Sequence, residues 1–322
     1  MRLIKSVAAV AAALAASVAL AQAYPNKPIK LIIPFAPGGT TDIVGRIMAA
    51  KLSPILGQPV IVENRAGAGG SIGAGELVKA APDGYTIGMG SVSTMGTNIV
   101  AYKNNKLDPI TQFTHITNLA SVPGIIFVNK NFPQKDFKSL VAELKANPGK
   151  YSYASSGAGA VGHLAMELFL VETGTDAQHI AYKGAGPAVT DVLAGNVPIM
   201  WDNLSSSLAQ IKAGNFVPIG LAFPKRIPQL PNVPTFAELG LKNYEADTWF
   251  GFVGPANLPK DIVKKIYDAS MQVLKDPDTI KKFEENGAFV IGNTPEQFTE
   301  QIKREVAKWK RVVDAKKISL DL

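Results

Sequence analysis

Glycine-rich segments that follow expected strands are the residues of this sequence best suited to binding an anion. Residues 37–42 (PGGTTD) lie between an apolar run and an amphipathic helical pattern. Gly38 and Gly39 allow the backbone to approach a ligand closely, and the first N–H groups of a helix have no partner within it. Such a segment suits a carboxylate or a phosphate. Thr40 or Thr41 could equally serve only as the helix cap, and the sequence leaves both interpretations open.

A second segment of the same kind lies in the middle of the chain. Residues 155–159 (SSGAG) follow an expected strand and open a helix over residues 161–173. Two such loops, one from each half of the protein, could clamp one ligand between them. The glycines also have the G-x-G-x-x-G spacing of dinucleotide-binding loops. However, Lys183 follows the next strand where an acid should bind the ribose, and we therefore set dinucleotide binding aside.

Asp202 and His163 are further candidate ligand contacts. Asp202 comes directly after an expected strand at residues 198–201, where a carboxylate either caps a helix or accepts a hydrogen bond from a ligand hydroxyl or ammonium. His163 lies in the first turn of the helix that follows residues 155–159. The chain has three histidines without metal-ligand spacing and no cysteine, so we expect neither a metal site nor a cofactor.

One segment raises the alternative of a secreted serine hydrolase. Gly69, Ser71 and Gly73 have the G-x-S-x-G spacing of a nucleophile elbow. An elbow serine sits directly at the end of a strand, whereas five residues separate the expected strand at residues 60–63 from Gly69. Ser71 is more simply the cap of the helix that contains Ile72, Leu77 and Val78. Because a matched base and nucleophile are missing from the other loops, the sequence favours binding over catalysis.

The elements that must position these loops are short apolar runs alternating with helical patterns. This alternation predicts an α/β fold with doubly wound sheets, and buried runs of this kind are typical of parallel strands. In such sheets, ligands bind beyond the carboxyl ends of the strands. The expected strands are residues 30–35, 60–63, 85–91, 125–129, 151–155, 179–182, 198–201, 217–222 and 249–253.

Chain length predicts two lobes. A chain of 322 residues is too long for one comfortable core. Residues 121–124 (SVPG) and 243–247 are the expected crossings from one lobe to the other. We therefore expect a discontinuous first lobe of residues 24–123 plus 247–322, and a second lobe of residues 124–246.

The first 23 residues have the layout of a cleavable signal peptide. Arg2 and Lys5 precede an apolar stretch at residues 6–20, and Ala23 ends an A-x-A site. A membrane-spanning helix would need about 20 apolar residues, so we expect cleavage after Ala23 and export to the periplasm. The net charge of +7 is concentrated in the C-terminal helices without interleaved aromatic residues, which indicates a solvated surface and no nucleic-acid partner.

A resemblance becomes visible along nearly the whole remaining chain. The sequence resembles the tripartite tricarboxylate transporter receptors, also called the Bordetella uptake gene family, in several segments that occur in the same order. These segments are residues 24–39 (YPNKPIKLIIPFAPGG), 62–70 (VENRAGAGG), 82–86 (PDGYT), 155–159, 182–184 (YKG), 202–203 (DN), 233–235 (VPT), and Trp249 with Gly251.

This resemblance implies a type II periplasmic binding fold, in which two lobes close on a carboxylated solute and deliver it to membrane transporter subunits. We expect the protein to be a monomer and not an enzyme. Family members bind ligand carboxylates through main-chain groups and ordered waters at the first glycine loop. The expected ligand contacts are Phe35, Gly38, Gly39, Thr40, Thr41, Asp42, Ser93, Thr94, Ser155, Ser156, Gly157, Ala158, Gly159, His163 and Asp202.

The chain departs from the family pattern at the expected cleft. Many relatives read Gly-Thr-His-Ala-Ile-Asn where this chain has residues 93–98 (STMGTN). Met95 would place a soft apolar side chain against the ligand, which suits an apolar or aromatic body. Dicarboxylates, tricarboxylates, amino acids and aromatic acids therefore all stay open. A sensor that binds its ligand without transport is a further alternative.

Overall fold

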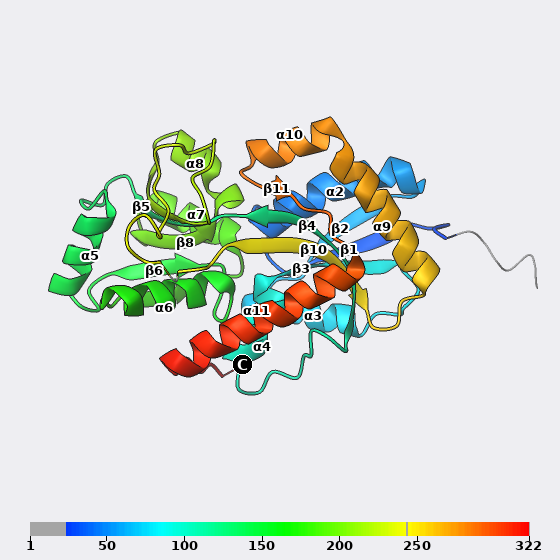
Figure 1. Ribbon diagram of the computed structural model, residues 1–322, viewed down its shortest axis with the longest axis horizontal. Helices are drawn as coiled ribbons and strands as arrows, with labels where there is room; N and C mark the ends of the chain where they lie inside the picture. Colours follow the sequence, from blue (N-terminus) through cyan, green and yellow to red (C-terminus); the bar gives the residue numbers. More distant parts are fainter. Residues whose placement is uncertain (1–23, 243, 322) are drawn as a thin grey trace, which may run out of the picture.

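The protein consists of two lobes, each built around its own mixed β-sheet (Figure 1). The structure is a computed structural model that describes residues 24–242 and 244–321. The expected signal peptide lies outside the described residues. Within them, no helix has the length and apolar character needed to cross a membrane.

The first lobe contains a six-stranded sheet with the order β11-β4-β10-β3-β1-β2. Strands β1, β2 and β3 are parallel, whereas β10 runs antiparallel to both β3 and β4. The strands are β1 (Ile29–Ile33), β2 (Val60–Asn64), β3 (Thr86–Ser91), β4 (Phe113–Val122), β10 (Thr248–Pro255) and β11 (Phe289–Val290).

The second lobe repeats this plan in a five-stranded sheet with the order β7-β6-β8-β5-β9. Again three strands are parallel, and one strand, β5, runs antiparallel to its two neighbours. In each lobe, the strand by which the chain enters from the other lobe, β10 in the first and β5 in the second, runs antiparallel to both of its neighbours. The strands are β5 (Gly124–Asn129), β6 (Ser152–Ser155), β7 (Gln178–Ala181), β8 (Ile199–Asn203) and β9 (Phe216–Ala222).

The chain changes sheets twice. It leaves the first sheet at Val122 and enters the second at Gly124, so the crossing predicted at residues 121–124 coincides with this change. It returns between Ala222 and Thr248. The predicted second crossing at residues 243–247 falls in this segment, although Asn243 lies outside the described residues.

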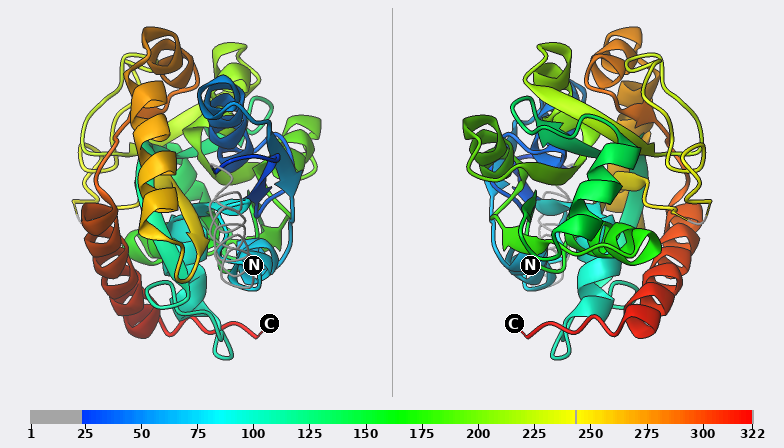
Figure 2. Two further views of the ribbon diagram at one scale, coloured as in Figure 1. Left: turned by 90° about the vertical axis from the view of Figure 1, so that its right-hand side faces the viewer. Right: turned by 90° about the vertical axis from the view of Figure 1, so that its left-hand side faces the viewer.

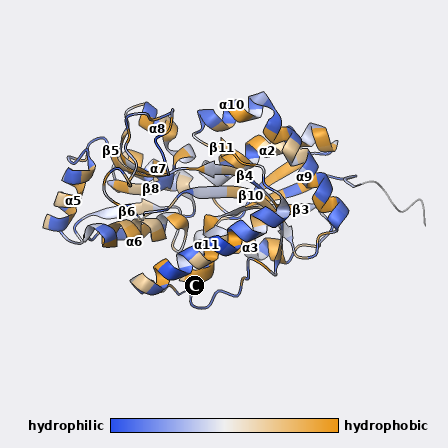
Figure 3. Ribbon diagram, in the orientation of Figure 1, coloured by the Kyte–Doolittle hydropathy of each residue, from blue (hydrophilic) through white to orange (hydrophobic). Residues whose placement is uncertain are grey.

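Helices cover both faces of the two sheets. The C-terminal helices α9, α10 and α11 gather on one flank of the molecule in the end-on views of Figure 2. Figure 3 shows hydrophilic and hydrophobic residues alternating along α9 and α11, as expected for surface helices. The helices are α2 (Thr40–Leu56), α3 (Ser71–Val78), α4 (Asn98–Ala101), α5 (Phe137–Ala146), α6 (Val161–Thr173), α7 (Ala185–Ala194), α8 (Leu208–Lys212), α9 (Lys260–Lys275), α10 (Pro277–Glu285) and α11 (Pro295–Lys316).

Helix α2 illustrates how the sequence sets these elements. Val44, Met48 and Leu52 recur at helical spacing and are buried against the first sheet. The helix ends where Gly57 takes a left-handed conformation with φ of 70°, which glycine adopts without strain. Each face of the sheets carries one apolar cluster, and each cluster continues from one lobe into the other.

Two features of the sheets differ from the sequence-based expectation. The apolar runs at β5 and β10 were expected to be parallel, but they are antiparallel, because a strand buried on both faces has the same composition in either direction. Strand β4 was missed because Thr114, His115, Thr117 and Asn118 interrupt its apolar pattern. Three of these side chains, those of His115, Thr117 and Asn118, are buried all the same. Thr299 and Asn293 supply hydrogen-bond partners to His115 Nδ1 and Thr117 Oγ1.

Candidate binding site

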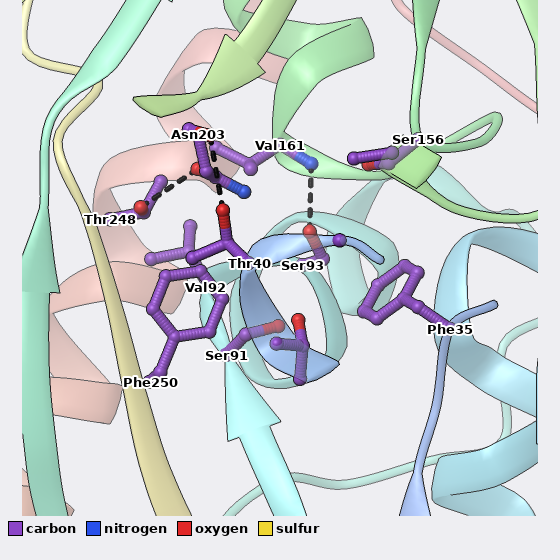
Figure 4. Close-up of a pocket in the computed structure, with 13 residues that line it drawn as sticks. Phe35, Thr40, Ser91, Val92, Ser93, Ser156, Val161, Asn203, Thr248 and Phe250 are labelled. Atoms are coloured by element: carbon purple, nitrogen blue, oxygen red, sulfur yellow. Dashed lines mark hydrogen bonds between the residues drawn. The ribbon is translucent and has the colours of Figure 1, made fainter. Parts of the chain in front are cut away.

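A small pocket lies between the two lobes (Figure 4). Its lining residues all come from the carboxyl ends of strands, from the first turns of the helices that follow, or from the start of β10. Phe35 and Phe250 stand at opposite sides of it. None of the lining side chains carries a charge: they are Phe35, Gly39, Thr40, Thr41, Ser91, Val92, Ser93, Ser156, Val161, Ala185, Asn203, Thr248 and Phe250.

Three helices begin at this pocket. Residues of the first turn of α2, α6 and α7 line it, and the N-cap residues Gly39, Ala160 and Gly184 provide no side-chain cap. The first N–H groups of a helix have no intrahelical acceptor, and the helix dipole adds partial positive charge at this end. The pocket therefore has a positive potential without a cationic side chain, which favours an anionic ligand.

Asp42 holds the loop that precedes α2. Its Oδ2 accepts hydrogen bonds from Gly38 N at 3.1 Å and Arg46 Nε at 2.9 Å, and its Oδ1 accepts one from Asn64 Nδ2 at 2.9 Å. Burial alone would raise the pKa of Asp42, but the bonds from Arg46, Asn64 and Gly38 together lower it. A carboxylate with this many donors is a brace for the loop and does not line the pocket.

Replacing Asp42 by asparagine should destabilise the protein by about 1–3 kcal/mol, because a buried amide would face donors that now bind a carboxylate. The free energy of unfolding in urea measures this loss. Because the folded-state pKa of Asp42 is lowered, its contribution to stability is present above the unfolded pKa and disappears only as the pH falls below the ordinary carboxyl range.

Asp268→Asn is the matched control, since Asp268 forms an exposed ion pair with Lys264. We expect it to cost less than about 0.5 kcal/mol. Equal effects of the two variants would contradict the bracing role.

Hydrogen bonds join the two lobes around the pocket. Thr40 Oγ1 donates to Asn203 O at 3.0 Å, and Val161 N donates to Ser93 Oγ at 3.1 Å (Figure 4). Thr248 Oγ1 lies 2.8 Å from Asn203 Oδ1. Outside the pocket, Ala36 N donates to Lys183 O at 3.0 Å, and Tyr102 OH donates to Ala158 O at 2.8 Å. The lobes are thus in direct contact on several sides of the cavity.

Asp202 does not line the pocket but lies directly behind its lining residues. It is 2 % exposed, and its Oδ2 accepts a hydrogen bond from Ser206 Oγ at 2.7 Å. Ser206 Oγ is in turn 3.3 Å from Thr40 Oγ1 of the first lobe. Burial raises the pKa of Asp202 to about 7, although hydrogen bonds from Ser206, Ser207 and the backbone of Asn203 oppose this rise. The charged form is therefore disfavoured, and the carboxyl group acts through Ser206.

The loop at residues 155–159 is held by side chains beneath it. Ser155 Oγ accepts a hydrogen bond from Gly157 N at 3.2 Å and lies 2.7 Å from His179 Nε2. Gly159 N donates to His163 Nδ1 at 3.2 Å, and the rings of His163 and His179 stack at 3.9 Å. Burial lowers the pKa of His163 to about 4, and burial together with the charge of His163 lowers that of His179 to about 3. The pair is neutral near pH 7 and supports the loop in that form.

Ser91 is a pocket residue whose hydroxyl is unsatisfied. It ends strand β3, is 3 % exposed, and its Oγ has no hydrogen-bond partner among the described residues. In Figure 4 this oxygen turns toward the other pocket residues. A buried hydroxyl without a partner is costly, so a group aimed into a cavity is a candidate ligand contact.

The structure separates the predicted contacts into two sets. Phe35, Gly39, Thr40, Thr41, Ser93 and Ser156 line the pocket. The others support these residues or lie beside them without lining the pocket: Gly38, Asp42, Thr94, Ser155, Gly157, Ala158, Gly159, His163 and Asp202. The expectation that Met95 faces the ligand is wrong, because Met95 lies in an apolar cluster and lines a separate small cavity with Ile32 and Leu77.

The sequence-based reading did not select Ser91, Asn203, Thr248 or Phe250 as contacts. A signal for Ser91 and Asn203 was available, since both end strands at the ligand-binding edge of a sheet. Thr248 and Phe250 gave no such signal, because they belong to the start of the antiparallel strand β10. The expected strand began one residue too late to include Thr248.

The geometry gives no support to the hydrolase alternative. Ser71 Oγ is buried, and none of the described residues hydrogen-bonds to it. His115 is bound to Thr299 and Pro109, whereas the other two histidines stack against each other. The described residues also contain no group of three or more histidine, aspartate or glutamate side chains that could hold a metal ion.

Comparisons with known proteins agree with this geometry. Residues 44–318 match the family of tripartite tricarboxylate transporter receptors. The chain is 34% identical over 294 residues to the protein BugT of Bordetella pertussis, an alignment that covers 91% of this chain and 90% of BugT.

Solved structures show the same fold. A protein described as a periplasmic transporter is 46% identical, with a TM-score of 0.91 over 93% of this chain and 100% of that one. The R. palustris protein Rpa4515, solved with adipate, is 33% identical, with a TM-score of 0.89 over 92% of this chain and 99% of that one. These likenesses confirm the expected two-lobed periplasmic binding fold.

Proposed function

The chain belongs to the tripartite tricarboxylate transporter receptor family, and from this premise we propose that it captures a small carboxylic acid between its two lobes and delivers it to membrane transporter subunits. The observation that carries the proposal is the convergence of the N-termini of α2, α6 and α7 on a pocket without a charged side chain. This arrangement suits a carboxylate, because main-chain N–H groups and hydroxyls are fixed donors.

The pocket favours an acid without an ammonium group. An α-ammonium needs a carboxylate or several free acceptors, but the lining residues include no acid. Asp42 is saturated by three donors, and Asp202 is held behind Ser206 with its pKa raised to about 7. Asn203 O and Asn203 Oδ1 already accept from Thr40 and Thr248. Adipate, the ligand of the relative Rpa4515, has the required chemistry and is our first probe.

Ligand capture proceeds by closure of the lobes. We assign residues 24–123 with 247–322 to the first lobe and residues 124–246 to the second, with the hinge at the two crossing segments. The acid binds to pocket-lining residues of both lobes, and closure buries it under the contacts between residues 36–40 and residues 183–203. Asp42, Asp202, Ser155 and His163 act by holding the loops that make these contacts.

The setting of this function is the periplasm. The signal peptide is cleaved after Ala23, and the mature chain acts there as a monomer without a cofactor. Its relatives include a protein described as a periplasmic transporter. Membrane subunits then accept the closed, loaded protein.

Replacing Ser91 by alanine should weaken the binding of the best acid about 5- to 10-fold, as expected for the loss of one hydrogen bond of about 1 kcal/mol. The stability of the free protein should hardly change, because Ser91 Oγ has no partner among the described residues. Isothermal titration calorimetry against succinate, adipate, 2-aminoadipate, benzoate and phthalate measures both the ligand class and this loss. Adipate should bind at least about 10-fold more tightly than 2-aminoadipate, which differs only by the ammonium group.

Ser71→Ala is the matched control. Ser71 Oγ is also buried without a partner, but it lies outside the pocket lining. This variant should bind acids like the wild type, and neither protein should hydrolyse a simple ester. Binding of no acid by the wild type would refute the proposed function. Ester hydrolysis that disappears in Ser71→Ala would favour the hydrolase instead.

A further inference from the structure

Glu305 is a buried carboxylate behind the ligand pocket. It lies on α11, is 9 % exposed, and accepts hydrogen bonds from two tryptophan indoles. Trp309 Nε1 donates to Oε1 at 2.7 Å, and Trp249 Nε1 donates to Oε2 at 3.3 Å. Lys308 Nζ lies 2.6 Å from Oε1 and balances the charge. Each carboxylate oxygen thus has its own indole donor.

The first indole partner belongs to one wall of the pocket. Trp249 lies between Thr248 and Phe250 on β10, and both of these neighbours line the cavity. Successive side chains of a strand point to opposite faces, so Trp249 is directed away from the pocket when its neighbours are directed toward it. The bond to Glu305 therefore fixes the rotation of β10 where the strand forms the pocket.

A second wall of the pocket, formed by residues 93–97, also contacts Glu305. Residues 93–97 form a buried π-helical turn, a rare conformation that is frequent at functional sites. This turn contains the pocket residue Ser93, which accepts the hydrogen bond from Val161 of the other lobe. A Cβ atom added to Gly96 would lie 3.2 Å from Glu305 Cγ and 3.6 Å from Trp309 Cδ1. The turn is therefore packed on the aliphatic part of the Glu305 side chain and on Trp309, the indole partner of its carboxylate.

We propose that Glu305 is a positioning residue for ligand binding, which fixes β10 and the π-helical turn relative to each other and so couples α11 to the shape of the pocket. The inference rests on the proposed binding function. It requires the carboxylate itself: a glutamine at this position has one acceptor oxygen, and its NH₂ group would face the second indole N–H. One of the two pocket walls would then lose its anchor.

The experiment compares Glu305→Gln with Glu300→Gln, an exposed position on the same helix that pairs with Lys303. We expect Glu305→Gln to raise the dissociation constant for adipate, or for the tightest acid of the panel, about 10-fold, and Glu300→Gln to leave it unchanged. In ¹H–¹⁵N NMR spectra of the unliganded protein, the indole signal of Trp249 or Trp309 should move in Glu305→Gln alone.

Two further variants separate positioning from a general loss of stability. Phe283→Leu changes a fully buried side chain of α10, in the apolar cluster on the other face of the sheet, and should lower stability without changing affinity. Trp249→Phe removes one of the two donors. Adding Glu305→Gln to this variant should weaken binding much less than it does in the wild type, because no second indole then faces the amide.

The outcomes are distinguishable. If the wild type binds acids and Glu305→Gln binds them equally well, the positioning role is wrong while the binding function stands. If Glu305→Gln and Phe283→Leu lose affinity in proportion to their loss of stability, the role is structural only. If the wild type binds no acid, the proposed function itself fails.

Discussion

Replacing Gly186 by alanine should weaken acid binding about 10- to 100-fold, the effect of 1–3 kcal/mol of overpacking at a contact made only when the lobes are together. Gly186 lies in the first turn of α7, in the second lobe. A Cβ atom there would lie 2.2 Å from Pro37 O, in the glycine loop of the first lobe. Carbonyl oxygens of a braced loop cannot move aside as a flexible side chain does, so the lobes must separate.

The stability of Gly186→Ala should stay close to that of the wild type. The residue is within a helix, where alanine is favoured over glycine by about 1 kcal/mol, and the clash is between lobes and not within one. Urea unfolding measures the stability of the variant, and calorimetric titration measures its affinity for the acid. In small-angle X-ray scattering with ligand present, the variant should have a larger radius of gyration than the wild type.

Gly75→Ala is the matched control for this variant. Gly75 is also within a helix, α3, and a Cβ atom there would have no neighbour within 4 Å. It should bind the acid like the wild type. If Gly186→Ala also bound with wild-type affinity, the contact between Gly186 and Pro37 would not belong to the ligand-bound state, and closure would have to follow another path.

The pattern of strand, glycine and helix was sufficient to find two of the loops that contribute residues to the pocket lining. Residues 37–42 and 155–159 were found from their position after apolar runs, because the carboxyl end of a strand and the start of a helix can both be recognised locally. Thr248 and Phe250 could not be found in this way. They reach the pocket because β10 returns from the other lobe and inserts antiparallel, and that pairing depends on residues more than a hundred positions away.

The roles of the ionisable residues were also beyond the sequence. Asp42, His163 and Asp202 were expected as ligand contacts, whereas in the structure none of the three lines the pocket. Whether such a side chain faces the cavity or the loop behind it depends on burial and on partners such as Arg46, Gly159 and Ser206. The uncharged pocket lining thus depends on buried ionisable groups behind it, which hold its loops in place through hydrogen bonds.

Lowering the pH should destabilise the wild-type protein more than the variant His163→Asn. The folded-state pKa of His163 is lowered by burial to about 4, whereas an unfolded histidine titrates near 6.5. Between these values the unfolded chain binds more protons, so stability is lost as the pH falls. From pH 7 to pH 5 we expect this histidine to account for a loss of about 2 kcal/mol. Asp202, with its pKa raised to about 7, has the opposite sign but is common to both proteins.

His163→Asn measures the contribution of His163 to this pH dependence. Asparagine keeps an acceptor for the hydrogen bond from Gly159 N, while it removes the titrating ring. Urea unfolding at pH 7, 6 and 5 should show the difference in stability between variant and wild type shifting steadily in favour of the variant. His115 serves as the internal reference, because it is present in both proteins. Burial lowers its pKa as well, but it lies away from the loop, bound to Thr299 and Pro109. Parallel pH profiles for wild type and His163→Asn would mean that the stacked histidines are protonated in the folded protein, and that the loop at residues 155–159 is held in some other way.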